Sequence, residues 1–230
     1  PCCPSTLSRL YASLEQSVCL FEKETVIINQ YISGSYNPVP GLRFHMRSRL
    51  PWQGIIRITF EGGSTAVTSL NLRLPAWSGT PILRMNGTDL QGSLKTGNHA
   101  RRHSAVGLHF EDCAYQSIEN QFQDGDVLEL QLPMPSVLRK QDARVPKCGG
   151  LFAVTRGPLV YCLESVDNPG GVFGLKIRED ILKANYEPDL LGGTVVINGR
   201  TADGIDIRFI PYMLWGNRGK SNMNVFFDVA

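Results

Sequence analysis

The sequence predicts a mainly β fold, with two β-sandwich-like domains preceded by one helix. After Glu24, short segments rich in Val, Ile, Phe and Thr follow one another, separated by Gly, Pro, Asn and Asp at intervals of roughly ten residues. Apolar and polar residues alternate within them, as in Ile56-Arg57-Ile58-Thr59-Phe60, which is typical of half-buried antiparallel strands. Many short strands of this kind favour sandwiches over a parallel α/β sheet.

An amphipathic helix is predicted near the start of the chain, from residue 5 to about residue 23. Apolar side chains recur there at three- and four-residue steps, as on one face of a helix: Leu7, Leu10, Tyr11, Leu14, Val18 and Phe21. Pro4 precedes the segment, and Ser5 is suited to the N-cap position. Because one helix cannot form a domain, we expect it to pack on something outside this sequence.

The strands are predicted from the same alternation and from the turn residues between them. They cover residues 25–33, 42–49, 54–60, 68–74, 82–85, 115–118, 127–132, 151–155, 159–163, 172–176, 194–196, 205–211 and 223–229. Asn86-Gly87 and Asp124-Gly125-Asp126 are turn sequences between such strands.

A connector containing Pro, Lys and Arg, over residues 133–150, predicts a boundary between two sandwich-like units near Pro135. We therefore divide the chain into a terminal helix (1–24), a β-sandwich domain (25–135) and a second β-sandwich-like domain (136–230). Residues 92–112 lack periodicity and hold three of the four histidines, so we interpret them as a long surface loop.

Composition and charge narrow the classes of partner. Hydrophobic residues make up 42% of the chain and charged residues 19%, which is globular and not disordered composition. The 23 basic and 21 acidic side chains nearly balance, and the densest basic run, Arg101-Arg102-His103, is too short for a nucleic-acid surface. No apolar run approaches the roughly 20 residues of a membrane helix. We expect polar solutes as partners, with no nucleic acid and no membrane.

Cys2-Cys3-Pro4 is the most suggestive motif chemically. A helix N-terminus carries partial positive charge, which lowers a cysteine pKa, and thiolates are both nucleophiles and zinc ligands. Adjacent cysteines lack the spacing of a zinc knuckle, so a reduced pair at a chain end is the alternative interpretation. The chain begins at Pro1, directly before this motif, which we interpret as a start within a longer protein.

The remaining cysteines do not form an evident disulfide framework. The six are widely scattered, at Cys2, Cys3, Cys19, Cys113, Cys148 and Cys162. A chain of this length needs no disulfides for stability, so the pattern favours reduced thiols and, with them, a cytoplasmic location.

The other candidate groups have ordinary structural explanations. His99 and His103 have helical spacing, yet their segment shows no helix pattern, so a solvated insertion is favoured over a metal site. Glycosidases need two facing carboxylates, and the sequence singles out no pair. The carboxylates considered are Glu61, Glu111, Asp112, Glu119, Asp124, Asp126, Glu129, Glu164 and Asp167, with solvated surface positions as the default. The aromatic residues Trp52, Trp77, Tyr212 and Trp215 are expected to pack in the core rather than to stack on sugars.

Several stretches together resemble glycoside hydrolase family 127, the β-L-arabinofuranosidase-like enzymes. The stretches occur in the family's order over nearly the whole chain: Cys2-Cys3-Pro4, Leu50-Pro51-Trp52-Gln53-Gly54, Leu72-Arg73-Leu74-Pro75-Ala76-Trp77, Met85-Asn86-Gly87, Gly125-Asp126-Val127, Leu132-Pro133-Met134-Pro135, Arg156-Gly157-Pro158-Leu159-Val160-Tyr161-Cys162-Leu163-Glu164, Asp167-Asn168-Pro169, Ile210-Pro211-Tyr212 and Trp215-Gly216-Asn217-Arg218-Gly219. The chain departs from the family at Pro4-Ser5-Thr6, where Pro-Asn is usual, and in its long histidine-containing loop.

The resemblance implies an N-terminal (α/α)₆ catalytic barrel followed by β-sandwich domains. The first helix then matches the last helix of a barrel that this sequence lacks. By the same resemblance Cys2 matches the nucleophile, and Cys2 and Cys3 match zinc ligands. The other zinc ligands and the acid/base glutamate lie upstream in the family. Two ligands do not make a zinc site, so we expect zinc in the intact parent, and an inactive, zinc-free fragment here.

Three functions remain open at this stage. The first is the C-terminal fragment of a retaining glycosidase acting on β-L-arabinofuranosides or related plant-glycan sugars. The second is a non-catalytic β-sandwich module that binds carbohydrate or supports another domain. The third is an unrelated thiol or zinc protein in which Cys2-Cys3 has redox work. A homodimer through the sandwich surfaces is a further partner that the sequence leaves open.

Overall fold

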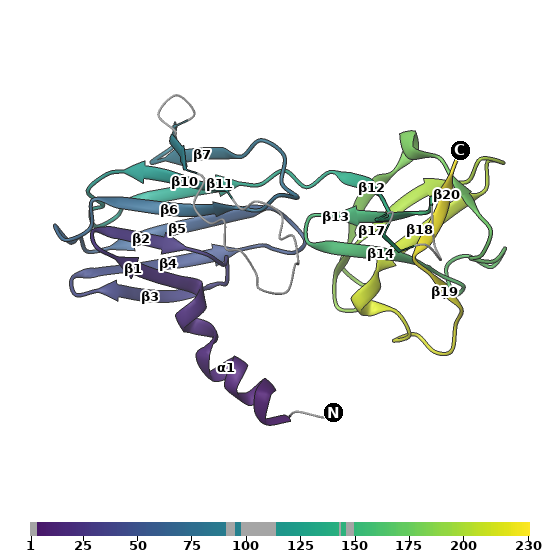
Figure 1. Cartoon of the computed structure of the whole chain (residues 1–230), viewed down its shortest axis with the longest axis horizontal. Coiled ribbons are helices and arrows are strands. Elements are labelled where there is room, and N and C mark those ends of the chain that lie inside the picture. Colours follow the sequence, from purple (N-terminus) through teal and green to yellow (C-terminus); the bar gives the residue numbers. More distant parts are fainter. Residues whose placement is uncertain (1–3, 91–94, 98–113, 143, 146–149) are drawn as a thin grey trace. The chain divides into compact units, whose positions relative to one another are not determined.

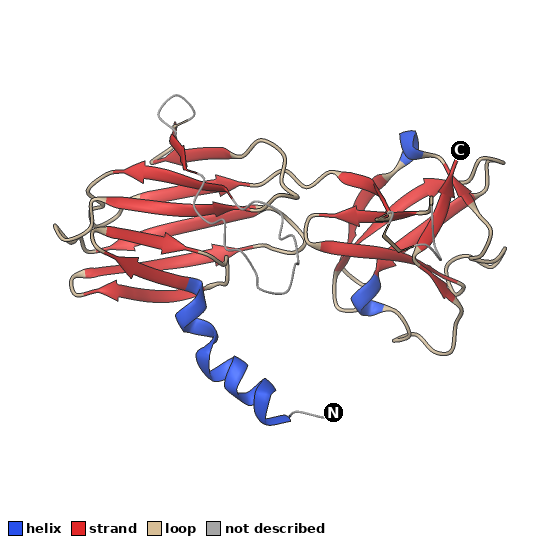
Figure 2. Ribbon diagram, in the orientation of Figure 1, coloured by secondary structure: helices blue, strands red, loops and turns tan. Residues whose placement is uncertain are grey.

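The computed structural model describes residues 4–90, 95–97, 114–142, 144–145 and 150–230. The chain divides into two compact units, Pro1–Pro133 and Met134–Ala230. Both consist mainly of strands (Figures 1 and 2), so the predicted mainly β class is confirmed. The predicted division was at residue 135, close to the end of the first unit. In the described part of the chain, no helix is long and apolar enough to cross a membrane.

The N-terminal unit is a sandwich of two sheets. Among the described residues the first sheet has the order β1-β2-β6-β10-β9, with β1 Cys19–Glu22, β2 Thr25–Ile28, β6 Ser69–Leu74, β10 Ala114–Glu119 and β9 Lys95–Gly97. The second has the order β3-β4-β5-β11-β7-β8, with β3 Gly34–Val39, β4 Leu42–Ser48, β5 Ile55–Glu61, β11 Val127–Gln131, β7 Ile82–Met85 and β8 Thr88–Asp89. Neighbouring strands are antiparallel except β2 and β6, which are parallel.

One hydrophobic core fills the space between these two sheets. Alternate residues of each strand point inward, so Leu72 of the first sheet joins Phe44, Ile58 and Leu130 of the second. Burial of each such side chain contributes roughly 1.5–3 kcal/mol. Gly54, in one of the family-like stretches, is required by close packing, because a Cβ there would lie 1.9 Å from the Leu132 carbonyl oxygen.

The C-terminal unit is built around one extended strand path. Within the described residues its order is β15-β20-β13-β14-β18-β17-β16, with β12 also paired to β13 and β19 to β14. The bounds are β12 Ser136–Lys140, β13 Phe152–Arg156, β14 Leu159–Glu164, β15 Lys176–Ile177, β16 Lys183–Glu187, β17 Thr194–Arg200, β18 Asp206–Pro211, β19 Met223–Asn224 and β20 Phe226–Val229. The described residues of this unit also form the short 3₁₀ helices η3 Glu179–Ile181 and η4 Tyr212–Leu214.

Strand β14 is buried on both of its faces. Tyr161 and Leu163 belong to a core that also holds Phe209 and Phe227, whose rings meet edge to face with centroids 5.4 Å apart. On the opposite face Cys162 packs in a smaller cluster with Val196 and Ile210. The last four residues of the strand are fully buried, and the carboxylate that ends it therefore lies inside the unit.

The N-terminal segment corrects the predicted helix at both ends. Helix α1 spans Pro4–Val18, so Pro4 is its first residue and Ser5 is not the N-cap. Proline suits the first helical position because its φ is already helical and its missing N–H would be unpaired there. Residues 19–22 form strand β1 instead of helix, because Cys19–Glu22 pair with Thr25–Ile28 in a hairpin.

Other differences concern strands with weak patterns. Strands β3, β8, β12 and β16 were not predicted, and Val172–Leu175 is not a strand although residues 172–176 were predicted as one. Strands β3 and β16 lie at sheet edges, where the backbone groups on one side of the strand need no partner. An edge position tolerates Pro38 in β3 and the run of exposed residues in β16. In the predicted loop at 92–112, residues 95–97 form β9, and the remaining positions lie outside the described residues. The predicted turns at Asn86-Gly87 and Gly125 are confirmed, with positive φ at all three residues.

Helix α1 exposes the apolar face that the sequence predicted. Leu7, Leu10 and Tyr11 are 54%, 56% and 70% exposed, while Leu14 is half-buried and Val18 is buried. Because short helices gain most of their stability from packing, we expect the amides of α1 to exchange rapidly in the 230-residue chain. Hydrogen-exchange mass spectrometry checks this. Strongly protected α1 amides in a monomer would contradict the interpretation that the helix packs on residues outside this sequence.

Candidate functional site

The two cysteines singled out by the sequence, Cys2 and Cys3, lie outside the described residues. Their predicted roles as nucleophile and zinc ligands therefore stay predictions. Helix α1 begins at Pro4, the next residue along the chain, and has no acidic residue in its first turn. No carboxylate of that turn therefore offsets the partial positive charge of the helix end, which favours a thiolate.

The described thiols are poor nucleophile candidates. Cys19 and Cys162 are free cysteines. Burial raises the pKa of Cys19 to about 11. Burial, with the nearby Glu164 carboxylate, raises the pKa of Cys162 to about 12. Both side chains therefore stay protonated at neutral pH, and the thiolate is the reactive form.

The described residues contain no metal centre. Nowhere among them do three or more His, Cys, Asp or Glu side chains lie close enough together to hold a metal ion. His45 accepts or donates a hydrogen bond with Ser35 Oγ at 2.6 Å through Nδ1, and its Nε2 lies 2.8 Å from Glu61 Oε1. Ser35, His45 and Glu61 lie on the exposed face of the second sheet. The other three histidines, at positions 99, 103 and 109, lie outside the described residues.

Most of the candidate carboxylates have structural roles at the surface. Glu129 pairs with Arg57 at 2.8 Å, and the pair is half-exposed. Asp124 and Asp126 organise the turn before β11, where Asp124 Oδ1 accepts the Gly62 N–H at 3.0 Å and Asp126 Oδ2 accepts the Gln123 N–H at 2.8 Å. Glu111 and Asp112 lie outside the described residues. The solvated positions expected from the sequence fit Glu129, Asp124 and Asp126.

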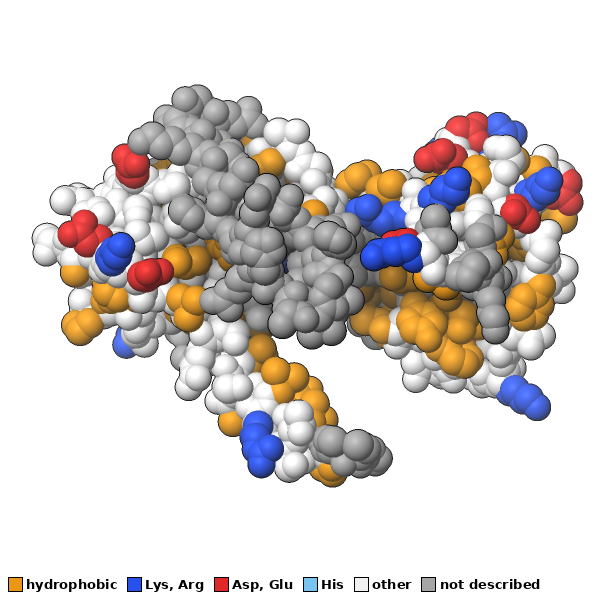
Figure 3. All heavy atoms as spheres, viewed as in Figure 1, with side chains coloured by type: hydrophobic (Ala, Val, Ile, Leu, Met, Phe, Trp, Pro, Cys, Tyr) orange, Lys and Arg blue, Asp and Glu red, His pale blue; other side chains and the backbone are white. Residues whose placement is uncertain are grey.

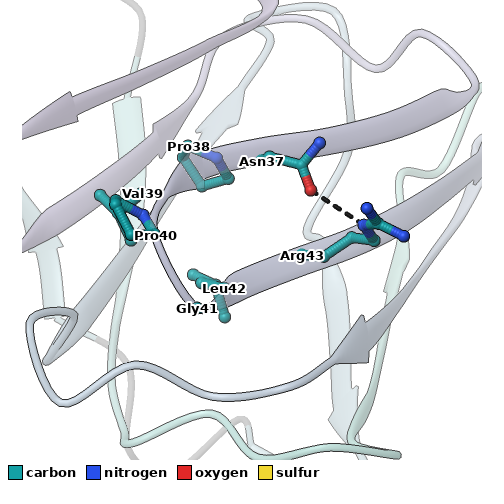
Figure 4. Close-up of a pocket in the computed structure, with 7 residues that line it drawn as sticks. All are labelled: Asn37, Pro38, Val39, Pro40, Gly41, Leu42 and Arg43. Carbon is teal, nitrogen blue, oxygen red and sulfur yellow. Dashed lines mark hydrogen bonds between the residues drawn. The ribbon is translucent and has the colours of Figure 1, made fainter.

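A shallow hollow at the tip of the β3–β4 hairpin offers no reactive group. It is lined by residues Asn37, Pro38, Val39, Pro40, Gly41, Leu42 and Arg43 (Figure 4). Arg43 Nε donates to Asn37 Oδ1 at 2.9 Å, so the two polar side chains of the lining bind each other. The lining contains neither a carboxylate nor a histidine or cysteine.

Glu164 and Asp167 differ from the other carboxylates because they are buried together around one guanidinium. The side chain of Glu164 is fully buried, and those of Asp167 and Arg218 are 8% and 18% exposed. Arg218 Nη2 donates to Glu164 Oε2 and to Asp167 Oδ2, both at 2.5 Å, and Arg218 Nη1 donates to Asp167 Oδ1 at 2.8 Å. We call Glu164, Asp167 and Arg218 the Arg218 cluster.

The cluster ties the loop after β18 to the end of β14. Glu164 Oε1 accepts the Gly216 N–H at 2.9 Å and the Ser221 hydroxyl at 2.7 Å. The buried Asn168 fixes the neighbouring strand, since its Nδ2 donates to the carbonyl oxygens of Glu164 and Arg208 and its Oδ1 accepts the Arg208 N–H. Three separate family-like stretches, which contain Glu164, Asn168 and Arg218, thus meet at one place.

The electrostatics of the cluster favour a structural role over acid–base catalysis. Burial alone raises the pKa of Glu164, but hydrogen bonds from Ser221, Arg218 and the Gly216 N–H together hold it below its ordinary value. The hydrogen bond to Asp167 raises the pKa of Arg218, with Glu164 adding to the effect. A general acid needs a raised pKa to carry a proton at neutral pH. Glu164 therefore stays ionised, and Arg218 offsets its charge. The carboxylate fixes the position of the loop after β18 and does not carry a proton.

Sequence reasoning missed this cluster because its members are far apart in the chain. In the sequence Arg218 belongs to a family-like stretch that indicates no role for it, and the default expectation that Glu164 and Asp167 are solvated is wrong, because both side chains are buried. One signal was present: Glu164 directly follows the apolar run Tyr161-Cys162-Leu163. A carboxylate that continues a buried strand needs a cationic partner, and Arg218 is that partner.

The cluster makes the stability of the C-terminal unit depend on pH. The folded-state pKa of Glu164 is lowered, so its contribution is fully present above the unfolded value of about 4.3 and is lost as pH falls through the folded value. We expect the unit to lose stability below about pH 4. Hydrogen exchange of β14 at a series of pH values checks this. Glu164→Gln should show a smaller acid-induced loss, and an undiminished loss would contradict the assignment.

The four aromatic candidates divide into two kinds. Trp77 is half-buried and packs against the core of the N-terminal unit, and Trp52 is half-buried as well. Tyr212 and Trp215 are 45% and 41% exposed, so the expectation that they pack in a core is wrong. Both lie on the loop that the Arg218 cluster holds.

These features define a mainly β module of two compact units, and comparison with known proteins gives its family. Residues 25–134 match the model of the "Beta-L-arabinofuranosidase, GH127 middle domain", and residues 137–228 match that of the "Glycoside hydrolase family 127 C-terminal domain". The chain belongs to glycoside hydrolase family 127.

The relatives named below are arabinofuranosidases or glycoside hydrolases. A non-reducing end β-L-arabinofuranosidase from Bifidobacterium longum subsp. longum is 30% identical over 98% of this chain. A GH127 β-L-arabinofuranosidase from Geobacillus stearothermophilus T6 has a similar structure over 100% of the chain, with a TM-score of 0.77 and 29% identity. A structure described as a glycoside hydrolase gives a TM-score of 0.79 and 26% identity over the same span.

The chain spans little more than a third of these relatives. It covers 36% of the Bifidobacterium protein, 37% of the Geobacillus structure and 40% of the third protein. More than half of each relative therefore has no counterpart in this sequence. This agrees with a further domain in the relatives, outside the region that this chain matches.

Proposed function

We propose that this chain is the C-terminal β-sandwich portion of a retaining glycosidase that hydrolyses β-L-arabinofuranosides or closely related sugars. One observation carries the proposal. Relatives named β-L-arabinofuranosidase match both units over 98–100% of this chain, while the chain accounts for only 36–37% of their lengths. The buried carboxylates Glu164 and Asp167 are both bound to Arg218, and we assign catalysis to the intact parent.

The nucleophile in this proposal is the thiolate of Cys2. Its Sγ attacks the anomeric carbon, forming a C–S bond as the C–O bond to the leaving group breaks, and an acid outside this sequence protonates the departing oxygen. Water then attacks the same carbon and releases Cys2 as thiolate. Two displacements at one carbon give net retention of configuration.

Zinc fits this site only in part. Cys2 and Cys3 would supply two thiolate ligands, whereas a structural or catalytic zinc needs three or four protein ligands. The described residues provide no further cluster of ligands. We therefore propose that the remaining ligands come from the upstream part of the parent and that the 230-residue chain neither retains zinc nor turns over substrate. When bound, zinc would keep the Cys2 sulfur deprotonated at neutral pH.

An assay of the complete gene product beside the 230-residue chain tests the proposal. The substrate is p-nitrophenyl β-L-arabinofuranoside, and zinc is measured by elemental analysis in both samples. We expect turnover and bound zinc in the complete protein and neither in the chain. Equal turnover in the chain, or none in a folded, zinc-loaded complete protein, would contradict the proposal.

A further inference from the structure

We propose that Tyr212, Met213 and Trp215 form a docking surface for the upstream catalytic domain of the same polypeptide. We call these three residues the Tyr212 ledge. The inference rests on the proposed function, because it takes the partner to be that domain. It goes further by naming the surface of the C-terminal unit that the domain covers and the buried interactions that fix the shape of that surface.

The ledge is a group of large apolar side chains left open to solvent. Tyr212, Met213 and Trp215 are 45%, 55% and 41% exposed. They lie on η4 and directly after it, and Figure 3 shows hydrophobic side chains gathered on the visible face of this unit beside η4. Contiguous apolar groups of this kind mark interaction sites, and Trp, Tyr and Met are enriched at protein interfaces.

The loop that presents the ledge is fixed from beneath by buried interactions. Gly216 donates its N–H, and Arg218 and Ser221 donate side-chain hydrogens, to the single buried carboxylate of Glu164. A buried ion network adds little net stability compared with an apolar replacement, but it specifies one geometry. A surface already held in its bound shape loses less conformational entropy on docking.

The direction of the polar groups favours a protein partner over a sugar. Arg218, Ser221 and the Gly216 N–H point into the unit, and Asn217 Nδ2 donates to the Leu214 carbonyl oxygen at 3.0 Å. A sugar site needs polar groups that converge on the ligand beside its aromatic platform. Here they bind the protein instead, and Met213, whose thioether adapts to irregular apolar surfaces, lies between the two aromatic residues in sequence.

The length of the relatives identifies the partner. In the solved relatives the matched part accounts for only 37–40% of the polypeptide, so more than half of the same molecule lies outside it and is available to cover this surface. A tethered domain is present at high effective concentration, so even a modest apolar surface suffices to hold it.

Hydroxyl-radical footprinting tests the proposal directly, because it labels exposed Tyr, Trp and Met side chains. The complete gene product and the 230-residue chain are labelled side by side and analysed by peptide mass spectrometry. Tyr186 is the matched control: it is 53% exposed on the edge strand β16 of the same unit, which β18 and β17 separate from β14. We expect several-fold less labelling of the ledge in the complete protein, relative to Tyr186.

Three outcomes would overturn the proposal. They are equal labelling of the ledge in both proteins, protection in the 230-residue chain that grows with its own concentration, and protection of that chain by added arabino-oligosaccharides. The last two would assign the ledge to a second copy or to a sugar.

Turnover of arabinofuranoside is scored separately, so an active protein with an unprotected ledge refutes only the docking. A protected ledge in an inactive protein refutes only the activity.

Discussion

Replacing Arg218 with alanine is expected to destabilise the C-terminal unit by about 3–5 kcal/mol, the usual effect of removing one partner from a buried ion pair. Glu164 is fully buried and Asp167 nearly so, and without the guanidinium both carboxylate charges would lose the donor that offsets their burial. Burying such a charge unpaired is costly. The loop over Trp215–Ser221 would lose its attachment to β14 at the same time.

Native-state hydrogen exchange of β14 and β18 measures this loss within one unit of a two-unit chain. Because about 1.4 kcal/mol corresponds to a tenfold change, exchange through opening of the unit should accelerate by roughly 100-fold or more. Arg57→Ala is the control, since its exposed pair with Glu129 is worth about 0–1 kcal/mol. Arg218→Lys keeps the charge but loses the forked geometry, so an intermediate loss is expected. A loss at Arg218 no larger than that of Arg57→Ala would show that the cluster does not hold this unit.

The second large effect is expected at Cys2. In the complete protein, Cys2→Ser should lower kcat on p-nitrophenyl β-L-arabinofuranoside by at least roughly 10⁴-fold, as removal of a nucleophile does in other enzymes. A serine hydroxyl is far less acidic than a thiol and would present little anionic nucleophile at neutral pH.

Cys19→Ser is the matched control for that experiment. Cys19 lies in the β1–β2 hairpin, and burial raises the pKa of its thiol to about 11, so it has no role as a nucleophile. Both variants should retain the hydrogen-exchange pattern of the sandwiches. Unchanged kcat in a folded Cys2→Ser protein would show that the nucleophile is another residue.

The regular part of the fold was predictable because its pattern is local. In β5 and β6 every second side chain enters the core, so alternation in the sequence marks the strands directly. The Asn86-Gly87 turn follows from the φ values that these residues tolerate. Strands β3 and β16 were missed because they lie at sheet edges, and their sequences are mostly polar or broken by proline.

The missed features depend on contacts between distant residues. The helical spacing of Val18 and Phe21 continues past the true end of α1, and only the pairing of Cys19–Glu22 with Thr25–Ile28 makes that segment a strand. Likewise Glu164 and Arg218 are separated by 54 residues, and nothing local indicates that one neutralises the other. The exposure of Trp215 follows from the same tertiary arrangement. The proposed roles of Cys2 and Cys3 rest on resemblance, because two adjacent cysteines have no metal-site spacing of their own.

Mass spectrometry of acid-quenched turnover tests the proposed chemistry most directly. The complete protein is mixed with excess p-nitrophenyl β-L-arabinofuranoside, denatured in acid during steady-state turnover and digested, and the peptide containing Cys2 is analysed. If the Cys2 thiolate is the nucleophile, this peptide carries one pentosyl group, and the group is absent in Cys2→Ser. A pentosyl group on an aspartate or glutamate peptide, or release of a product with inverted configuration, would contradict the proposal.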